Sequence, residues 1–150
     1  HKDDLPNYFL NISNFIENFI YGLSLGVIFT VLAQNIKTEY FTQGNESQTL
    51  LIVLIFSSVQ ISIGEEIVFR GFILGNLRKA NINVWNAIFV QAILFTLLHV
   101  TRYFGDWISI GFVFISALVA GYITLKQNSL MPAMIMHVCV NLSFVLFMHS

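Results

Sequence analysis

The chain has 150 residues, enough for one domain, and 56% of them are hydrophobic while only 10% are charged. A soluble domain usually carries about 25% charged residues, so this chain could not cover a water-exposed surface with polar side chains. The formal net charge is −1, and the sequence has no basic stripe that could hold a phosphate backbone, so we expect no nucleic-acid partner. The composition predicts an integral membrane protein in contact with the lipid bilayer.

Five apolar stretches are long enough to cross the hydrocarbon core, which takes about 20 residues. Backbone groups in lipid must be satisfied internally, and the alternation typical of barrel strands is absent, so each stretch is predicted to be a helix. We therefore expect an all-α, multi-pass transmembrane bundle, one domain over residues 1–150, with a polar cavity between the helices. In chain order the predicted helices cover roughly residues 12–34, 49–77, 82–101, 107–125 and 130–149.

The first predicted helix carries Gly22 and Gly26, four residues apart, a spacing that allows a second helix to approach closely. Glu17 lies beside Asn14 and Asn18, and marks either an interfacial part of this helix or a face toward the bundle interior. A polar connection over residues 38–49 separates this helix from the next.

The second predicted helix is long enough to tilt or to contain a break, and it holds Glu65, Glu66 and Arg70 within six residues. Each charge at bilayer depth costs about 3 kcal/mol, so these three must be paired, hydrated in a cavity, or used. Glu66 and Arg70 are spaced i, i+4 and can pair on one face. Consecutive residues point about 100° apart, so Glu65 and Glu66 face different neighbours. Glu65, without such a partner, suits a general base, although a purely structural ion-pair network is the alternative.

Polar groups recur in the third and fifth predicted helices. Phe95 and His99 are spaced i, i+4 near the end of the third helix, where a lone histidine can also be a simple interfacial residue. His137 and Asn141 share the same spacing inside the fifth helix, far from its ends. Interhelical hydrogen bonding could explain this second pair without any chemistry, at about 0.6 kcal/mol per contact. Cys139 lies on roughly the opposite face from His137 and is predicted to pack as a small apolar residue.

Signals at the helix ends complete the prediction. Ser129 shortly before Pro132 indicates the start of the last helix. The aromatic residues at predicted helix ends are typical of the membrane-interface belt, and they are Trp85, Tyr103 and Trp107. Lysines and arginines in the connections favour a cytoplasmic N-terminus, since four fall on that side (Lys2, Arg78, Lys79, Lys126) and two on the other (Lys37, Arg102).

A carboxylate, two imidazoles and an amide on three helices are a set that could hydrolyse a peptide with water. The carboxylate would take a proton from water, and donors from histidine and asparagine would stabilise the oxyanion of the tetrahedral intermediate. The alternative is a zinc site, because two histidines and a carboxylate are also a catalytic ligand set, although HExxH is absent. The zinc ligands would be Glu65, His99 and His137.

Three segments together resemble a known family. EEIVFR matches EExxxR, FTLLH matches FxxxH and HVCVN matches HxxxN, in this order on successive apolar helices. This pattern is similar to that of the CPBP family, which comprises CAAX prenyl endopeptidases and bacteriocin-processing or immunity proteins, also called the Abi group. The matching core covers residues 64–141.

The resemblance implies an intramembrane endopeptidase with a helical bundle around a polar cavity. It implies that Glu65 activates water with His99 as its partner, and that His137 and Asn141 form the oxyanion site. Glu66, Arg70 and Phe95 would be supporting residues. The family has been described both as metalloproteases and as metal-independent glutamate proteases, and we expect no cofactor here, with zinc as the alternative. Family members usually have more spans than the five expected here, so the resemblance implies either a short member or a chain that lacks N-terminal helices.

The sequence thus predicts a multi-pass protease that cleaves a membrane-associated peptide or protein. A prenylated CAAX substrate is one option, and a leader peptide or small membrane peptide is another. An Asn-, Ile- and Phe-rich composition favours a bacterial cell membrane. Two other classes stay open: a non-enzymatic immunity or scaffold protein that keeps these residues as a packing core, and a small transporter or proton relay that uses Glu65 and the histidines.

Overall fold

A computed structural model describes residues 14–36 and 48–147, and every regular element in these two ranges is a helix. The prediction of an all-α bundle is therefore confirmed, and the helix ends differ from the predicted ones by only a few residues. The elements are α1 (Phe15–Asn35), α2 (Gln48–Glu66), the π-helix η2 (Ile67–Leu74), α3 (Gly75–Lys79), α4 (Val84–Val100), α5 (Trp107–Gln127) and α6 (Met131–Phe147).

Three of these helices are long and apolar enough to cross a membrane, namely Phe15–Asn35, Leu51–Lys79 and Trp107–Gln127. The span Leu51–Lys79 runs through α2, η2 and α3. The two remaining helices, α4 and α6, are apolar but have 17 residues each. At 1.5 Å per residue they extend about 26 Å, slightly less than the hydrocarbon core of about 30 Å. Large apolar side chains on the outer faces of the helices are exposed, as a lipid environment requires.

The second predicted span is one continuous rod with an irregularity inside it. The α-helical turns of α2 end at Glu66, eight residues of π-helix follow in η2, and α-helical turns resume in α3. A π-helix bonds i to i+5, so it shifts which residues face the interior, and such segments are frequent at functional sites. The expected break is therefore a change of helical register directly after the two glutamates.

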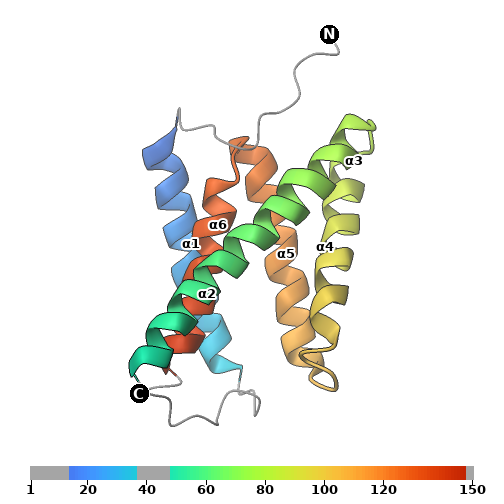
Figure 1. Cartoon of the computed structure of the whole chain (residues 1–150). Helices are drawn as coiled ribbons and strands as arrows, with labels where there is room; N and C mark the ends of the chain where they lie inside the picture. Colours follow the sequence, from blue (N-terminus) through green and yellow to red (C-terminus); the bar gives the residue numbers. More distant parts are fainter. Residues whose placement is uncertain (1–13, 37–47, 148–150) are drawn as a thin grey trace.

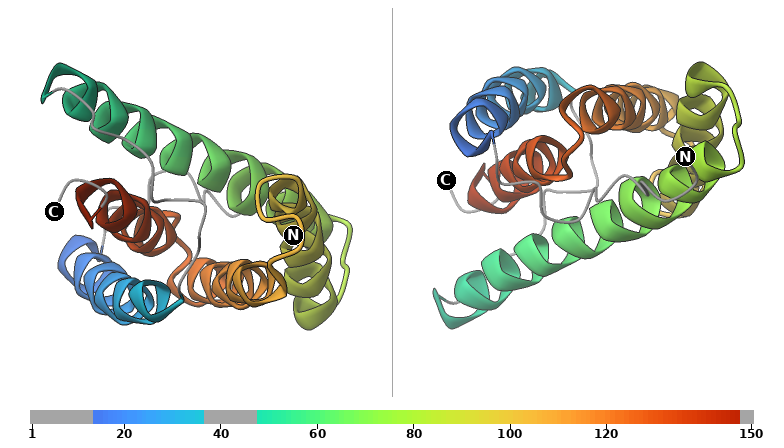
Figure 2. Two further views of the ribbon diagram at one scale, coloured as in Figure 1. Left: turned by 90° about the horizontal axis from the view of Figure 1, so that it is seen from below. Right: turned by 90° about the horizontal axis from the view of Figure 1, so that it is seen from above.

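The helices enclose an interior from two sides. The rod from α2 to α3 crosses the bundle diagonally in front of the other helices (Figure 1). Seen along the bundle, this rod runs along one side, α1 and α5 run along the other, and α6 lies between α1 and α2 (Figure 2). Helix α4 packs against both α5 and η2 and closes one end. This arrangement brings the end of α2, the end of α4 and the middle of α6 together.

Local sequence explains where α5 and α6 begin and end. The Asp106 side chain caps α5 by accepting hydrogen bonds from the backbone and hydroxyl of Ser109, which lowers the pKa of Asp106. Asn128 takes the left-handed conformation (φ 48°) that ends a helix. Ser129 then accepts a hydrogen bond of 3.2 Å from the backbone N–H of Met131, which confirms the predicted start of α6.

Close contact between α1 and α6 depends on the two glycines of α1. A Cβ at Gly22 would lie 2.8 Å from Cβ of Ile135 and 3.0 Å from the backbone of Pro132, and a Cβ at Gly26 would lie 2.8 Å from Cβ of Cys139. The predicted packing role of the glycine pair and of Cys139 is therefore confirmed. Glu17 is exposed on the first turn of α1, which agrees with its interfacial reading.

We expect the substitution Gly22→Ala to destabilise the protein by about 1–3 kcal/mol, because the new methyl group meets the backbone of Pro132, which cannot move aside. Thermal unfolding in detergent measures this loss. Gly111→Ala on α5 is the matched control: its Cβ would meet no atom within 4 Å, and the substitution should stabilise the helix by about 0.5–1 kcal/mol. Equal effects of the two substitutions would contradict close α1–α6 packing.

Candidate active site

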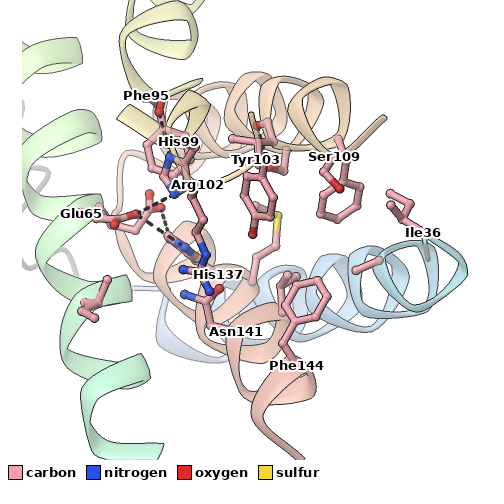
Figure 3. Close-up of a pocket in the computed structure, with 18 of the residues that line it drawn as sticks. Ile36, Glu65, Phe95, His99, Arg102, Tyr103, Ser109, His137, Asn141 and Phe144 are labelled. Carbon is pink, nitrogen blue, oxygen red and sulfur yellow. Dashed lines mark hydrogen bonds and ion pairs between the residues drawn. The ribbon is translucent and has the colours of Figure 1, made fainter. Parts of the chain in front are cut away.

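A partly enclosed cavity of about 80 Å³ lies inside the bundle, with room for a few water molecules. Its walls come from α1, α2, η2, α4, α5, α6 and the turn between α4 and α5. The charged and polar candidate residues of the sequence analysis all line it, and we call them the polar cluster: Glu65, Glu66, Arg70, His99, His137 and Asn141. Residues separated by up to 76 positions in the chain thus share one cavity (Figure 3).

The carboxylate of Glu65 faces both imidazoles. Its Oε2 atom lies 3.7 Å from Nε2 of His99 and 3.8 Å from Nε2 of His137. These three side chains are largely buried, between 13 and 20% exposed, and all three line the cavity. Oε2 is itself buried and has no hydrogen-bond partner within the described residues, so it faces both nitrogens just beyond hydrogen-bond distance.

The opposite edges of the two imidazoles are held by acceptors. Nδ1 of His99 lies 2.9 Å from the carbonyl oxygen of Phe95, and Nδ1 of His137 lies 2.8 Å from Oε1 of Glu66. A carbonyl can only accept, and Glu66 is a carboxylate paired with Arg70, so each Nδ1 carries the hydrogen and donates it. Both Nε2 atoms are therefore directed toward Glu65 and the cavity. The Nε2 edge of each imidazole is the one that could exchange a proton with a molecule in the cavity.

The predicted pair of Glu66 and Arg70 is present and fully buried. Nη1 of Arg70 lies 3.0 Å from Oε1 of Glu66, and each side chain is 1% exposed. Nη2 of Arg70 also donates to the carbonyl oxygen of Ala117 on α5, at 3.4 Å, and Gln91 of α4 donates to the same oxygen at 2.9 Å. Glu65 and Glu66 have different principal neighbours, as predicted, but His137 contacts both of them.

Phe95 explains why an aromatic residue precedes His99 by one turn. Its ring centroid lies 4.5 Å from that of His99 and 5.8 Å from that of His137, and the guanidinium carbon of Arg70 lies 4.4 Å above the ring. Phe69 packs on the same ring edge-to-face. Phe95 is 4% exposed, so it is an apolar support that fixes both imidazoles and the arginine rather than a cavity surface alone.

Asn141 is oriented by a residue that the sequence analysis does not identify. Its Nδ2 donates to Oγ of Ser62 on α2 at 2.9 Å, and that hydroxyl donates to the carbonyl oxygen of Ser58 at 2.7 Å. Because the hydroxyl hydrogen is committed to Ser58, the oxygen can only accept, and this requires the nitrogen of the amide to face Ser62. A serine one turn before Glu66 on the same helix is the only sequence signal for it.

The cavity extends away from the polar cluster into an apolar region (Figure 3). That region is lined mainly by aliphatic and aromatic side chains, namely Ile36, Phe112, Val113, Met136, Val140 and Phe144.

Tyr103 lies between the polar and apolar parts and is only 8% exposed. Its predicted place in the interfacial belt is therefore wrong. It packs inward because Phe69, Phe95 and Val113 form a cluster around it, whereas Trp85 and Trp107 are 65% and 78% exposed.

The residues named for the zinc alternative are Glu65, His99 and His137, and Oε2 of Glu65 lies 3.7 and 3.8 Å from the two Nε2 atoms. Within residues 14–36 and 48–147, no group of three or more His, Cys, Asp and Glu side chains is arranged to hold a metal ion. Oε1 of Glu66 is already occupied by Arg70 and His137, and Oε2 of Glu65 is the acceptor that both Nε2 atoms face.

The chain is thus a helical membrane protein with an internal cavity lined by carboxylate, imidazole and amide side chains. Such a set of groups is what a hydrolase embedded in the membrane needs. A family model described as "Type II CAAX prenyl endopeptidase Rce1-like" matches residues 47–143, about two-thirds of the chain, and the chain belongs to this family of membrane endopeptidases. No curated protein and no solved structure matches the chain significantly. The suspected relationship to CAAX proteases is confirmed, and the matched segment contains every residue of the polar cluster.

We expect Arg70→Met to destabilise the protein by about 3–5 kcal/mol, because it leaves the carboxylate of Glu66 buried without its cation. The double substitution Glu66→Gln and Arg70→Met should lose less than the single one, since no uncompensated charge remains. Thermal unfolding in detergent measures both. Lys79→Met, which removes an exposed cation at the end of the same rod, is the control and should change stability by less than about 0.5 kcal/mol.

Proposed function

We propose that the protein is an intramembrane endopeptidase in which Glu65 activates a water molecule for attack on a peptide bond. The observation that carries this proposal is the convergence of Oε2 of Glu65 with Nε2 of His99 and Nε2 of His137 on one cavity, beside Asn141. A base, a water-sized space and amide or imidazole donors are the parts that peptide hydrolysis by water needs.

The water would lie in the cavity against both Glu65 and His99. Nε2 of His99 accepts one of its hydrogen bonds, because Nδ1 donates to Phe95, and Glu65 takes the proton of the other O–H bond. The water oxygen then forms a bond with the carbonyl carbon of the substrate. General-base assistance of this kind contributes about 10²–10⁴-fold in rate.

The oxyanion would face His137 and Asn141. One hydrogen of the Asn141 amide is engaged by Ser62, and the second is available to the cavity. For His137 to donate from Nε2 as well as from Nδ1 it must carry both protons, and the carboxylates of Glu66 and Glu65 on either side balance that charge. When the tetrahedral intermediate collapses, the C–N bond breaks and the proton held by Glu65 passes to the leaving amine.

The apolar region of the cavity supports an apolar substrate group next to the scissile bond. It begins directly beside the polar cluster and is built from aliphatic and aromatic side chains of α1, α5 and α6. A membrane-associated peptide would fill it with an apolar side chain or a lipid group, because burial of such a group is favourable by about 25 cal/mol per Å². The substrate is therefore a membrane-associated peptide or protein, with a prenylated CAAX peptide as the first candidate from the family and a small leader or membrane peptide as the second.

The experiment that tests this function is peptide cleavage by the purified protein in proteoliposomes, with a farnesylated CAAX peptide and a library of membrane-proximal peptides. We expect cleavage by the wild type and a loss of about 10²–10⁴-fold in Glu65→Gln with unchanged thermal unfolding. Glu17→Gln, which alters an exposed glutamate on α1, is the matched control and should cleave like the wild type.

Two results would contradict the proposal. No cleavage of any peptide by a well-folded wild type would favour the immunity or scaffold alternative. Activity that a strong chelator abolishes and zinc restores would mean that Glu65, His99 and His137 act as metal ligands. We expect full activity in the chelator.

We expect Ser62→Ala to lower kcat about 10-fold, because the amide of Asn141 loses the acceptor that orients it. In an Asn141→Ala background the same substitution should have little further effect, since residues that act through one another are not additive. Ser143→Ala is the control: its hydroxyl donates only to the carbonyl oxygen of Val140 on the same helix. Additive losses from Ser62→Ala and Asn141→Ala would exclude the orienting role.

A further inference from the structure

Tyr103 is held in a fixed position beside the catalytic histidine. Its ring is stacked on the imidazole of His99, with centroids 6.5 Å apart and planes inclined by 9°. Its backbone N–H donates to the carbonyl oxygen of His99 at 3.1 Å, and its own carbonyl oxygen accepts from Asp106 at 2.9 Å. The turn after α4 therefore presents this tyrosine to the cavity in one orientation.

The hydroxyl of Tyr103 points into the cavity, between the polar cluster and the apolar region (Figure 3). Within the part of the chain that the structure describes, this hydroxyl makes no hydrogen bond to a protein group. Burial raises the pKa of Tyr103, an effect that Arg102 partly opposes, so the hydroxyl stays protonated around neutral pH and can donate. An inward-facing phenol with an unused donor is unusual, because buried tyrosine hydroxyls ordinarily find a partner.

A bound peptide would supply that partner. An extended substrate brings backbone N–H and C=O groups into the cavity, and each of them loses its water and needs a hydrogen bond from the protein. On the side of His99 that faces the apolar region, Tyr103 is the cavity residue with a free hydroxyl. The group it meets would belong to the substrate residue whose side chain enters the apolar region.

We propose that Tyr103 is a substrate-binding residue whose hydroxyl hydrogen-bonds a peptide group next to the scissile bond. This role rests on the proposed endopeptidase function and assigns to it a residue outside the three sequence motifs. It also predicts that the enzyme recognises its substrate at this position by a hydrogen bond to the peptide backbone, and that the apolar region binds the side chain.

The substitution Tyr103→Phe tests the proposal because it removes only the hydroxyl and keeps the ring on His99. We expect kcat/KM for the peptide cleaved best by the wild type to fall about 10-fold, mainly through a higher KM. A second readout does not need turnover: a fluorescent form of the peptide should bind Glu65→Gln about 10-fold more tightly than Glu65→Gln with Tyr103→Phe. Tyr122→Phe, on the exposed face of α5 and stacked on Trp85, is the matched control and should change neither value.

The outcomes separate this proposal from the function on which it rests. Absence of cleavage by the wild type overturns both. Cleavage by the wild type, with unchanged KM and unchanged peptide binding in Tyr103→Phe, overturns the role of Tyr103 and leaves the endopeptidase intact. A fall in kcat alone, with KM and binding unchanged, also overturns it, since the hydroxyl would then act on His99 and not on the substrate.

Discussion

A fully buried ion pair determines how this bundle is organised. Glu66 and Arg70 are each 1% exposed, and two charges buried this deeply need hydrogen-bonding partners besides each other. The pair is bound from two other helices: His137 of α6 donates to Glu66, and Arg70 donates to the carbonyl oxygen of Ala117 on α5, which also accepts from Gln91 of α4. One ion pair and the carbonyl oxygen it shares thus connect α2, η2, α4, α5 and α6.

The orientation of the two histidines follows from the same constraint. Once Glu66 engages Nδ1 of His137, the Nε2 edge of that imidazole must turn toward Glu65, and the carbonyl oxygen of Phe95 imposes the same orientation on His99. The ring of Phe95 packs on both histidines and on Arg70, so the apolar support and the polar network hold the same side chains. The result is a carboxylate whose Oε2 lies 3.7 and 3.8 Å from two imidazole nitrogens at the wall of the cavity.

Individual residues show how far the sequence could be interpreted. The apolar lengths predicted every helix, and the i, i+4 spacing predicted the Glu66–Arg70 pair correctly, because both depend on neighbours within one helix. Ser62 was missed because its partner Asn141 is 79 positions away, and a buried serine in an apolar run has no distinguishing local pattern. Tyr103 was assigned to the interface because it follows a helix end. The cluster that draws it inward, with Phe69 and Val113, forms only when η2, α4 and α5 meet.

The sequence by itself determined that the chain is a helical membrane protein and which polar residues its interior must accommodate, since hydropathy and the cost of charge in lipid act along the chain. Only the tertiary structure decided which edges of His99 and His137 face Glu65, that His137 joins both glutamates, and that a tyrosine hydroxyl enters the cavity. These features depend on the crossing of helices distant in sequence and on the π-helical segment that changes register after Glu66. Neither leaves a periodic signal, because contacts between helices are set by three-dimensional packing and not by spacing along one of them.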